Sequence, residues 1–571
     1  MDLQDIRQTD VWLLYEKGRN YLRLHNVYAD TDRNHRFYNG NQWEGAKLGD
    51  VEPVQKNFIK PIVKYKVAVV HDNLYAVVFS SQNFESTAFR EEADKYCDML
   101  NRYAARAWEK DRMDYKGRRI TFDACINDEG VLYVDFDKET MQPKNEIIDK
   151  TDIYFGNENS DDIQSQPYIL IRRRMPMANA IELAESMGVS QEDLRLIVSD
   201  NDTSEEPGVA AKLEVDDQVT VIYKLYKQKG KVHFSAATRY CELVADENMG
   251  ISLYPVAHFV WEEKKGSARG EGEVRTLIPN QIEVNKTELR RLIVTKQQAY
   301  PKTVADKKRI INHAAVNQVG GVIWTEDMTV DDVRKILGTI PPAQMSPDVV
   351  KLQEDLIHMS RELAGAGEIA TGSINPEDAS GKAILAVDQA AKAPVQMQKE
   401  GYKTFVEDVA RIWLEYLIVH SAQGVLMEYA QVNPQTGEER VEMTRVPQSA
   451  LLALKADVKV DVTPKSVYDR LALERTIENL LTNGFFNPQR VSELEIYYKV
   501  LPDDAVAPKL MIGEAIKYIK AEQQRIAQIQ NKAQAMMQRM QQAMNNAPGI
   551  PAASGPLAMG QAGGAGMQLP Q

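Results

Sequence analysis

Hydrophobic residues recur at helical spacing in two long segments of the chain. The first segment carries Ile278, Ile282, Leu289, Leu292 and Ile293. The second carries the same spacing through Tyr402, Phe405, Val406, Val409, Trp413, Tyr416 and Leu417. Apolar positions three and four residues apart line one face of a helix. The pattern therefore predicts long amphipathic helices over 267–300 and 382–420.

A shorter helix is predicted between these two, over 346–367, with Ser346 and Pro347 suited to its N-cap and first turn. A compact insert, 301–345, precedes it, and a break rich in Gly, Ser and Asp, 368–381, follows it. Pro394 is expected to kink the last helix, because proline removes a backbone donor. An ordinary buried core explains the apolar faces, but not two long helices that bracket one small insert.

The rest of the chain predicts helices, then strands, then helices. The first 110 residues indicate mainly helices, including an apolar one over 57–75. Strands are predicted at 129–137, 151–156, 166–175, 217–227, 231–237, 254–263 and 455–462. A helical excursion is predicted at 175–197, and hairpin turns at 227–230 and 433–437. Helices resume over 469–542, and the Gly/Ala-rich end, 543–571, has a composition typical of disorder. The predicted fold class is α+β, mainly helical.

Composition narrows the class of protein. At 571 residues the chain exceeds one hydrophobic core, and no apolar run approaches the ~20 residues that span a bilayer. The N-terminus lacks the apolar region of a signal peptide, which predicts synthesis in a cytoplasm. Cys97, Cys125 and Cys241 are scattered and predict buried core residues. A net charge of −13 opposes tight, non-specific binding to a phosphate backbone.

Several short motifs resemble parts of ligand sites but fail on spacing. SGKA at 380–383 lacks the glycine spacing and the hydroxyl residue of a phosphate loop, and GEG at 270–272 is more typical of a helix-entry turn. The acidic runs at 30–34 and 157–162 lack the required residues of a calcium loop and predict solvated turns. The aspartate pairs at 161–162, 331–332 and 503–504 are sequence neighbours that point apart on a strand. No metal site, cofactor or catalytic site is predicted, which favours a non-enzyme.

The order of these elements, with several local phrases, resembles the portal proteins of tailed double-stranded DNA bacteriophages. The phrases are FYNGNQW, NFIKPIVKYKVAVV, DEGVLYVDFD, DIYFGNENSDDIQSQPYILIRRRM, GEGEVRTLIPNQIEVNKTELRRL and ATGSINPEDASGKAI. The likeness runs from about residue 36 to residue 510. No phrase is diagnostic alone, so the resemblance depends on their order.

The resemblance implies a portal fold assembled as a ring, usually of twelve copies, at one capsid vertex. Its regions would be N-terminal helices with a β-rich wing (1–266), first stem helix (267–300), clip (301–345), second stem helix (346–367), tunnel loop (368–381), long kinked wing helix with wing strands (382–468), helical crown (469–542) and disordered tail (543–571). The protein would reside in the virion, after synthesis in the host cytoplasm.

The resemblance also implies which residues face the channel. In the tunnel loop they are Thr371, Gly372, Ser373, Asn375, Ser380, Gly381 and Lys382. In the stem they are Lys286, Arg290, Lys296, Lys351 and Glu354. Lys382 suits a transient phosphate contact and, equally, an ordinary solvated lysine in the first turn of a helix. Both stem helices mix acidic and basic residues, and a wall of mixed sign would keep its attraction for DNA low.

The implied partners are further copies of the chain, double-stranded DNA passing without sequence specificity, the terminase large subunit, a head–tail adaptor, and the major capsid and scaffolding proteins. No membrane is implied. Two alternatives stay open. One is a different head–tail or scaffold-associated phage protein that does not line the channel. The other is a metal-dependent nucleic-acid enzyme with a site built from scattered Asp and Glu residues.

Overall fold

The computed structural model describes residues 7–47, 52–72, 74–79, 87–200, 217–299, 344–366, 392–432, 439–454 and 458–463, with scattered residues in 303–339 and 476–539. The chain divides into two compact units, Met1–Ser466 and Val467–Gln571. In the second unit, residues 531–539 are helical. The described elements mix helix with strand, as the α+β class predicted.

Five helices occupy the N-terminal part of the first unit: α1 Asp10–Leu24, α2 Val27–Asn39, α3 Ile59–Val70, α4 Thr87–Lys110 and α5 Met113–Asn127. The side chain of Thr9 caps α1 by accepting the backbone N–H of Trp12. The predicted solvated turn at 30–34 is wrong, because these residues lie inside α2. The helix predicted over 57–75 ends at Val70, and a strand, β1 Leu74–Phe79, follows it.

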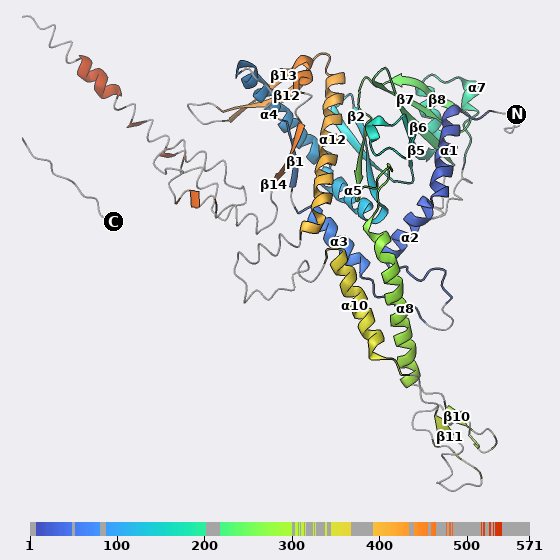
Figure 1. Ribbon diagram of the computed structural model, residues 1–571. Helices are drawn as coiled ribbons and strands as arrows, with labels where there is room; N and C mark the ends of the chain where they lie inside the picture. Colours follow the sequence, from blue (N-terminus) through green and yellow to red (C-terminus); the bar gives the residue numbers. More distant parts are fainter. Residues whose placement is uncertain are drawn as a thin grey trace, which may run out of the picture. The chain divides into compact units, whose positions relative to one another are not determined.

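Two antiparallel sheets form the middle of the first unit (Figure 1). One has the order β3-β2-β9, from β2 Glu129–Asp137, β3 Gln142–Ile148 and β9 Val256–Val260. The other has the order β4-β5-β6-β7-β8, from β4 Ile153–Phe155, β5 Tyr168–Pro176, β6 Gln218–Gln228, β7 Lys231–Ala237 and β8 Glu242–Asn248. Lys229 and Gly230 have positive φ between β6 and β7, which confirms the predicted hairpin turn. The helical excursion is also confirmed, as α6 Met177–Ser186 and α7 Gln191–Leu194.

The largest core forms around α12 Gln396–His420, which packs against β9, β2 and β1. Its predicted apolar face is buried from Tyr402 to Leu417. The indole N–H of Trp413 donates to Asn145 Oδ1 at 3.1 Å, and the Tyr416 hydroxyl donates to the Val134 carbonyl at 3.2 Å. Pro394 lies in the 3-10 turn η6 Ala393–Val395, directly before α12, and 367–391 lie outside the described residues.

The C-terminal strands of the first unit follow α12. The predicted hairpin is confirmed as β12 Val425–Val432 paired with β13 Glu439–Val446. The short helix α13 Gln448–Leu454 comes next, and β14 Val458–Thr463 then pairs with β1. Cys97, Cys125 and Cys241 are buried, as predicted.

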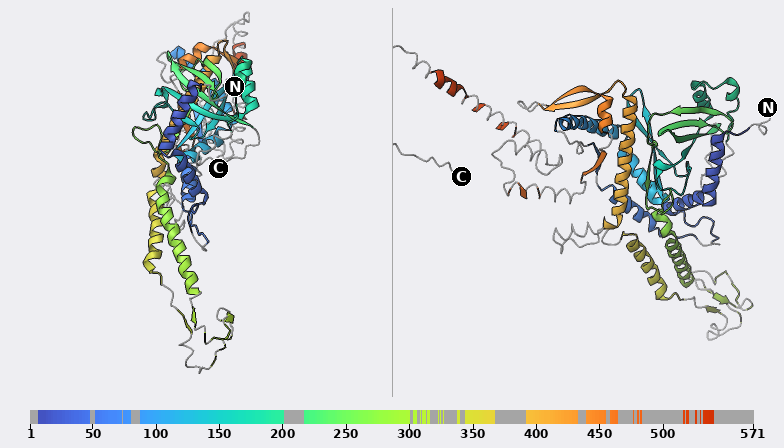
Figure 2. Two further views of the ribbon diagram at one scale, coloured as in Figure 1. Left: turned by 90° about the vertical axis from the view of Figure 1, so that its right-hand side faces the viewer. Right: turned by 45° about the horizontal axis from the view of Figure 1, so that its top comes forward.

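Two helices extend away from the sheets: α8 Glu273–Ala299 and α10 Pro347–Leu363 (Figures 1 and 2). Both helices were predicted, and α8 begins six residues after the expected start at 267. The Ser346 side chain accepts the Asp348 N–H, which confirms the predicted N-cap of α10. Between the helices, β10 Thr303–Ala305 pairs with β11 Leu337–Thr339. No helix among the described residues is long and apolar enough to cross a membrane.

Candidate functional site

The helices α8 and α10 form an antiparallel pair held by buried polar contacts. The Gln353 amide donates to Glu288 Oε2 at 2.6 Å, and the Asn280 amide donates to Ser360 Oγ at 3.0 Å. Gln353 and Ser360 are almost fully buried, at 2% and 1% exposure. The numbering increases along one helix as it decreases along the other, so the chain runs out along α8 and returns along α10. We call α8 and α10 the helix pair.

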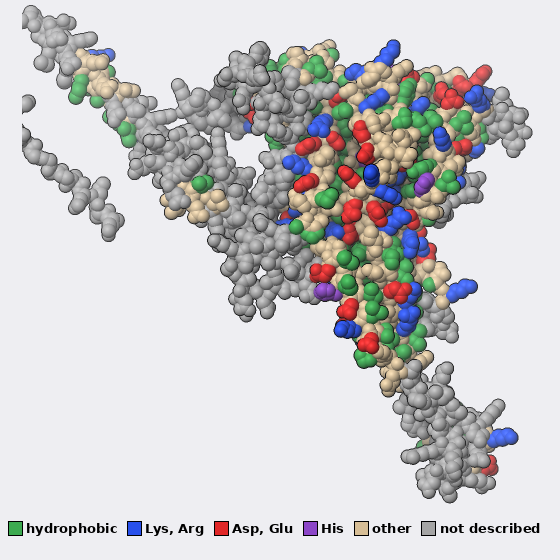
Figure 3. All heavy atoms as spheres, viewed as in Figure 1, with side chains coloured by type: hydrophobic (Ala, Val, Ile, Leu, Met, Phe, Trp, Pro, Cys, Tyr) green, Lys and Arg blue, Asp and Glu red, His purple; other side chains and the backbone are tan. Residues whose placement is uncertain are grey.

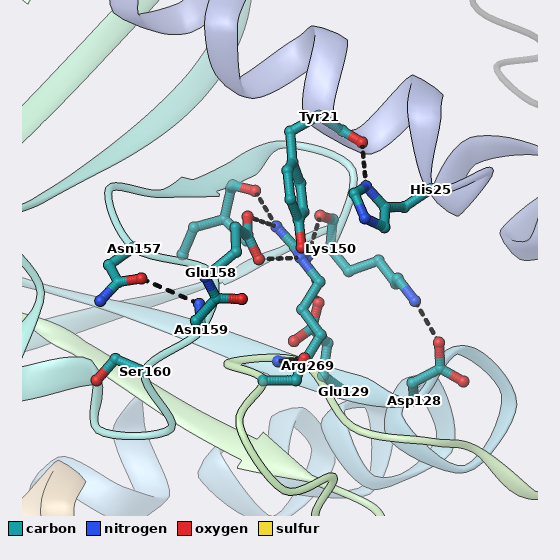
Figure 4. Close-up of polar contacts among 12 residues, drawn as sticks. Tyr21, His25, Asp128, Glu129, Lys150, Asn157, Glu158, Asn159, Ser160 and Arg269 are labelled. Atoms are coloured by element: carbon teal, nitrogen blue, oxygen red, sulfur yellow. Dashed lines mark hydrogen bonds and ion pairs between the residues drawn. The ribbon is translucent and has the colours of Figure 1, made fainter.

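The base of α8 is fixed by a buried ionic cluster, defined here as Arg269, Glu129, Glu158 and His258. Figure 4 shows the first three of these residues. The Arg269 guanidinium binds Glu129 at 2.5 Å and Glu158 at 2.9 Å. It also donates to the carbonyls of Lys150 and Ile153. His258 Nε2 lies 2.8 Å from the second oxygen of Glu129. The cluster therefore ties the loop that leads into α8 to β2, β9 and the start of β4.

Charges in this cluster depend on one another. Burial by itself would raise the pKa of Glu129, but Arg269, His258 and Lys150 outweigh it and lower that pKa to about 2. Burial would likewise lower the pKa of Arg269, but Glu129 and Glu158 raise it above its usual value. Removing one member of a buried ion pair leaves an uncompensated charge, at a cost of about 3–5 kcal/mol. The ion pairs of Arg269 with Glu129 and Glu158 therefore support α8 at its base.

Two glycines let the chain pass close to this support. A Cβ at Gly270 would lie 2.1 Å from Val260 Cγ1 and 2.5 Å from the Glu262 carbonyl. A Cβ at Gly272 would lie 2.8 Å from the Asp128 backbone nitrogen, and the Gly272 N–H donates to Asp128 Oδ1 at 2.8 Å. The next residue, Glu273, begins α8. The segment GEG therefore leads directly into the helix, as interpreted, but the prediction of a turn is wrong, because Glu271 forms an antiparallel bridge with Glu262.

A second ion pair secures the first turn of α8. Lys66 on α3 lies 2.6 Å from Glu273, and both side chains are only 7% exposed. The segment 52–58, which precedes α3 and which we call the strap, contacts α8 through Gln281 and Asn285. Gln281 accepts the N–H of Phe58 at 3.0 Å and donates to the Lys56 carbonyl at 2.9 Å. Together these contacts hold the upper part of α8 on two sides.

The strap contact extends one helical turn further along α8. The Asn285 amide donates to Gln42 Oε1 at 2.5 Å, and its oxygen accepts from Gln281 at 3.0 Å. Gln281 and Asn285 are 0% and 3% exposed. A buried backbone N–H or C=O without a partner costs free energy, and the amides of Gln281 and Asn285 supply partners for the strap backbone. These hydrogen bonds, at Lys56 and Phe58, bind the strap to α8.

The five residues predicted for the stem all lie on the helix pair and are exposed: Lys286, Arg290, Lys296, Lys351 and Glu354. Lys286 pairs with Glu283 at 2.7 Å. Figure 3 shows hydrophobic, acidic and basic side chains together on one face of the helix pair. The residues predicted for the tunnel loop lie outside the described residues: Thr371, Gly372, Ser373, Asn375, Ser380, Gly381 and Lys382.

Sequence reasoning missed the ionic cluster, because buried charges look like solvated ones in a sequence. The run at 157–162 is a turn, but Glu158 within it is only 9% exposed and binds Arg269, so the prediction of a wholly solvated turn is wrong. One signal was available: Glu129 stands directly before 130–134, a run of glycine and apolar residues in the same strand. Among the described residues, no three His, Cys, Asp or Glu side chains are grouped so as to hold a metal ion.

Comparison with known families gives one match that spans nearly the whole chain. The family model described as "Phage P22-like portal protein" matches residues 21–562. The match includes the ionic cluster, the strap, both helices of the pair and the insert between them. Comparison with curated proteins found none that matches.

Proposed function

Because the chain belongs to the phage P22-like portal protein family, we propose that its copies form a closed ring with the helix pair of each copy around a central DNA channel. The family match over residues 21–562 carries this proposal. Portal function belongs to the family, which implies an oligomeric ring associated with the capsid. Double-stranded DNA would enter through this channel during packaging and leave through it during ejection.

Membership of the portal family suggests how the segments of this chain divide among the regions of the ring. We assign the stem to 267–300 and 346–367, the clip to 301–345 and the tunnel loop to 368–381. The wing comprises 1–266 and 382–468, the crown 469–542, and 543–571 form a tail. The clip would contact the terminase large subunit during packaging and the head–tail adaptor afterwards. Capsid and scaffolding proteins would surround the wing, and twelve copies is the number we expect.

The helix pair suits a channel wall because its base is rigid. A channel wall that guides DNA must keep its position while the DNA passes. The ionic cluster, the Lys66–Glu273 pair and the strap all contact α8, or the loop before it, at the N-terminal end of the helix. The exposed surface further along contains acidic residues as well as lysines and arginines. Since each phosphate contact adds affinity by releasing counterions, acidic neighbours limit how tightly DNA binds.

The tunnel loop would supply the closest approach to DNA. Glycine lowers the cost of unusual backbone angles, so Gly372 and Gly381 would let this segment follow the duplex as it moves. Lys382 would make a transient phosphate contact at the start of the following helix. A protein of this kind needs no turnover of its own, because the ATPase is a separate partner.

Mass photometry of the purified full-length chain, combined with a nuclease assay, tests the proposal. The expected result is a single species of about a dozen copies that leaves DNA intact with or without Mg²⁺. A monomer or dimer that cuts DNA only when Mg²⁺ is added would instead support the enzyme alternative. A monomer without nuclease activity would point to a structural phage protein outside the channel.

A further inference from the structure

Exposed charges on the helix pair are separated by helix. On α8 the exposed charged residues are Arg275, Glu283, Lys286, Arg290, Arg291 and Lys296, all basic except Glu283. On α10 they are Asp348, Lys351, Glu354, Asp355 and Glu362, all acidic except Lys351. Two further acidic residues of α8 are less accessible: Glu273 is buried against Lys66, and Glu288 is half-buried and accepts a hydrogen bond from Gln353. Each helix was predicted to be mixed, but one exposed surface is mainly basic and the other mainly acidic.

The outer face of α10 also carries exposed apolar side chains. Leu352, Met359 and Leu363 are 54%, 60% and 81% exposed. They are spaced seven and four residues apart, so they form one stripe along the helix. Beside it, Asp348, Asp355 and Glu362 repeat every seven residues and form an acidic stripe. Apolar area flanked by charge is typical of a protein interface.

Helix geometry sets the direction of these stripes. Gln353 faces α8, and Asp355 follows it by two residues, which turns it by about 200° around α10. Lys286 precedes Glu288 by two residues and is turned by the same angle away from α10. Asp355 and Lys286 therefore lie on opposite outer sides of the pair. They cannot meet within one chain.

We propose that the acidic and apolar face of α10 binds the basic outer face of α8 in a second copy of this chain. The proposal rests on the proposed ring function and names the surface through which neighbouring stems contact each other. Two different faces that meet head to tail make a heterologous interface, the type that closes into a ring. A second copy of the chain is the expected partner, because each copy carries both the acidic face of α10 and the basic face of α8 that would bind it.

Cyclic symmetry also gives the register of this interface. Rotation about the ring axis leaves heights along that axis unchanged, so residues that are level within one chain are level between chains. Glu288 is level with Gln353, and Asn280 with Ser360. With the helix pair parallel to the ring axis, Lys286 is therefore level with Asp355 of the next copy. The apolar stripe would supply most of the buried area, while the charges fix orientation and height.

Cross-linking tests this register directly. The double variant Lys286→Cys/Asp355→Cys is treated, as an assembled ring, with a short bismaleimide and run on a denaturing gel. The expected result is a ladder of linked chains that extends up to the full ring. Each single cysteine variant should give no ladder. The native cysteines are at most 4% exposed, so the unmodified chain is a valid blank.

A matched pair gives the opposite pattern. The variant Glu288→Cys/Gln353→Cys places both thiols between the helices of one chain. It should link internally, change the mobility of the single chain and form no ladder. This control separates contact between copies from a general reactivity of the helix pair.

Charge reversal provides an independent readout. Lys286→Glu and Asp355→Lys, each alone, should raise by about tenfold the protein concentration at which half the chains are in rings, because the repulsion recurs at every interface. The two changes combined restore opposite charges and should restore assembly. Circular dichroism of each variant checks that the fold is unchanged.

The outcomes distinguish this inference from the proposed function. Rings of the unmodified chain with neither a ladder nor an effect of reversal would overturn the interface and leave the channel proposal standing. Free reaction of both thiols in the ring would show that these faces are open to a different partner, and would also overturn it. Failure of the unmodified chain to form rings would overturn both proposals.

Discussion

Among single residues, Arg269 is the one on which the support of α8 most depends. Among the described residues, only Arg269 forms ion pairs with both Glu129 and Glu158. We expect Arg269→Met to lower the free energy of unfolding by about 3–5 kcal/mol, because two buried carboxylates lose their partner. Urea unfolding followed by circular dichroism measures this change.

A surface arginine provides the control for Arg269. Arg411 is 45% exposed and pairs with Glu407 and Asp408 on the same helix. Since exposed pairs contribute about 1 kcal/mol or less, Arg411→Met should change the unfolding free energy far less than Arg269→Met. Equal losses in the two variants would mean that the ionic cluster has no special role.

Asp123 on α5 is predicted to destabilise the protein at neutral pH. Burial, and next the charge of Asp149, raise the pKa of this half-buried carboxyl to about 6 from 3.8. The folded state therefore loses stability as pH rises from 3.8 through 6, where the carboxyl must ionise. We expect Asp123→Asn to add about 1 kcal/mol at pH 7.5 and nothing at pH 4. Thermal unfolding at both values measures it, and a gain that is the same at both would contradict the assignment.

At the scale of elements, the contact between the strap and α8 makes a local prediction. Gln281→Ala removes both partners of the strap backbone at Lys56 and Phe58. Each buried polar group left without a partner costs about 1–3 kcal/mol. Hydrogen exchange should therefore become faster in residues 52–58, while exchange in the distant sheets stays the same. Gln297→Ala, on an exposed position of α8, should leave exchange in the strap unchanged.

The tunnel loop gives a functional prediction at the same scale. Deleting 372–381 removes the glycines and the polar residues expected to face DNA, and it leaves in place every contact of the helix pair that the described residues make. Rings should still assemble, whereas DNA packaging or retention in a phage complementation assay should fail. Normal genome filling by this deletion would contradict the role assigned to the loop.

Helices could be predicted from the sequence wherever a local pattern sufficed. The spacing through Tyr402 and Trp413 gave α12, and Ser346 with Pro347 gave the start of α10. Strand β1 was missed because its partner, β14, lies almost 400 residues away in the chain. The short strands β3 and β8 carry many polar residues and were missed for the same reason: their pairing decides their structure.

The candidate site shows the same division between local and long-range information. Periodicity predicted the helices on which Lys286 and Glu354 lie exposed, and their position at a channel stays a prediction. The contacts that position those helices, through Arg269 and Gln281, join segments more than a hundred residues apart. Spacing in one sequence contains no record of such pairs.

At the scale of the whole molecule, the protein and the DNA proposed to pass through its ring are both negatively charged. The net charge of the chain is −13, but the exposed charged residues of α8 are mainly basic and those of α10 mainly acidic. Contact between these faces in neighbouring copies would neutralise lysines and arginines that DNA phosphates would otherwise bind. The ring would then hold its own subunits firmly and its cargo weakly.

Electron microscopy of the purified chain can show whether its copies form a closed ring. We expect rings with a central hole in end-on views, and in side views a narrow stem formed by α8 and α10. Images that contain only compact, solitary particles without a hole, at concentrations where the protein is pure and folded, would contradict it.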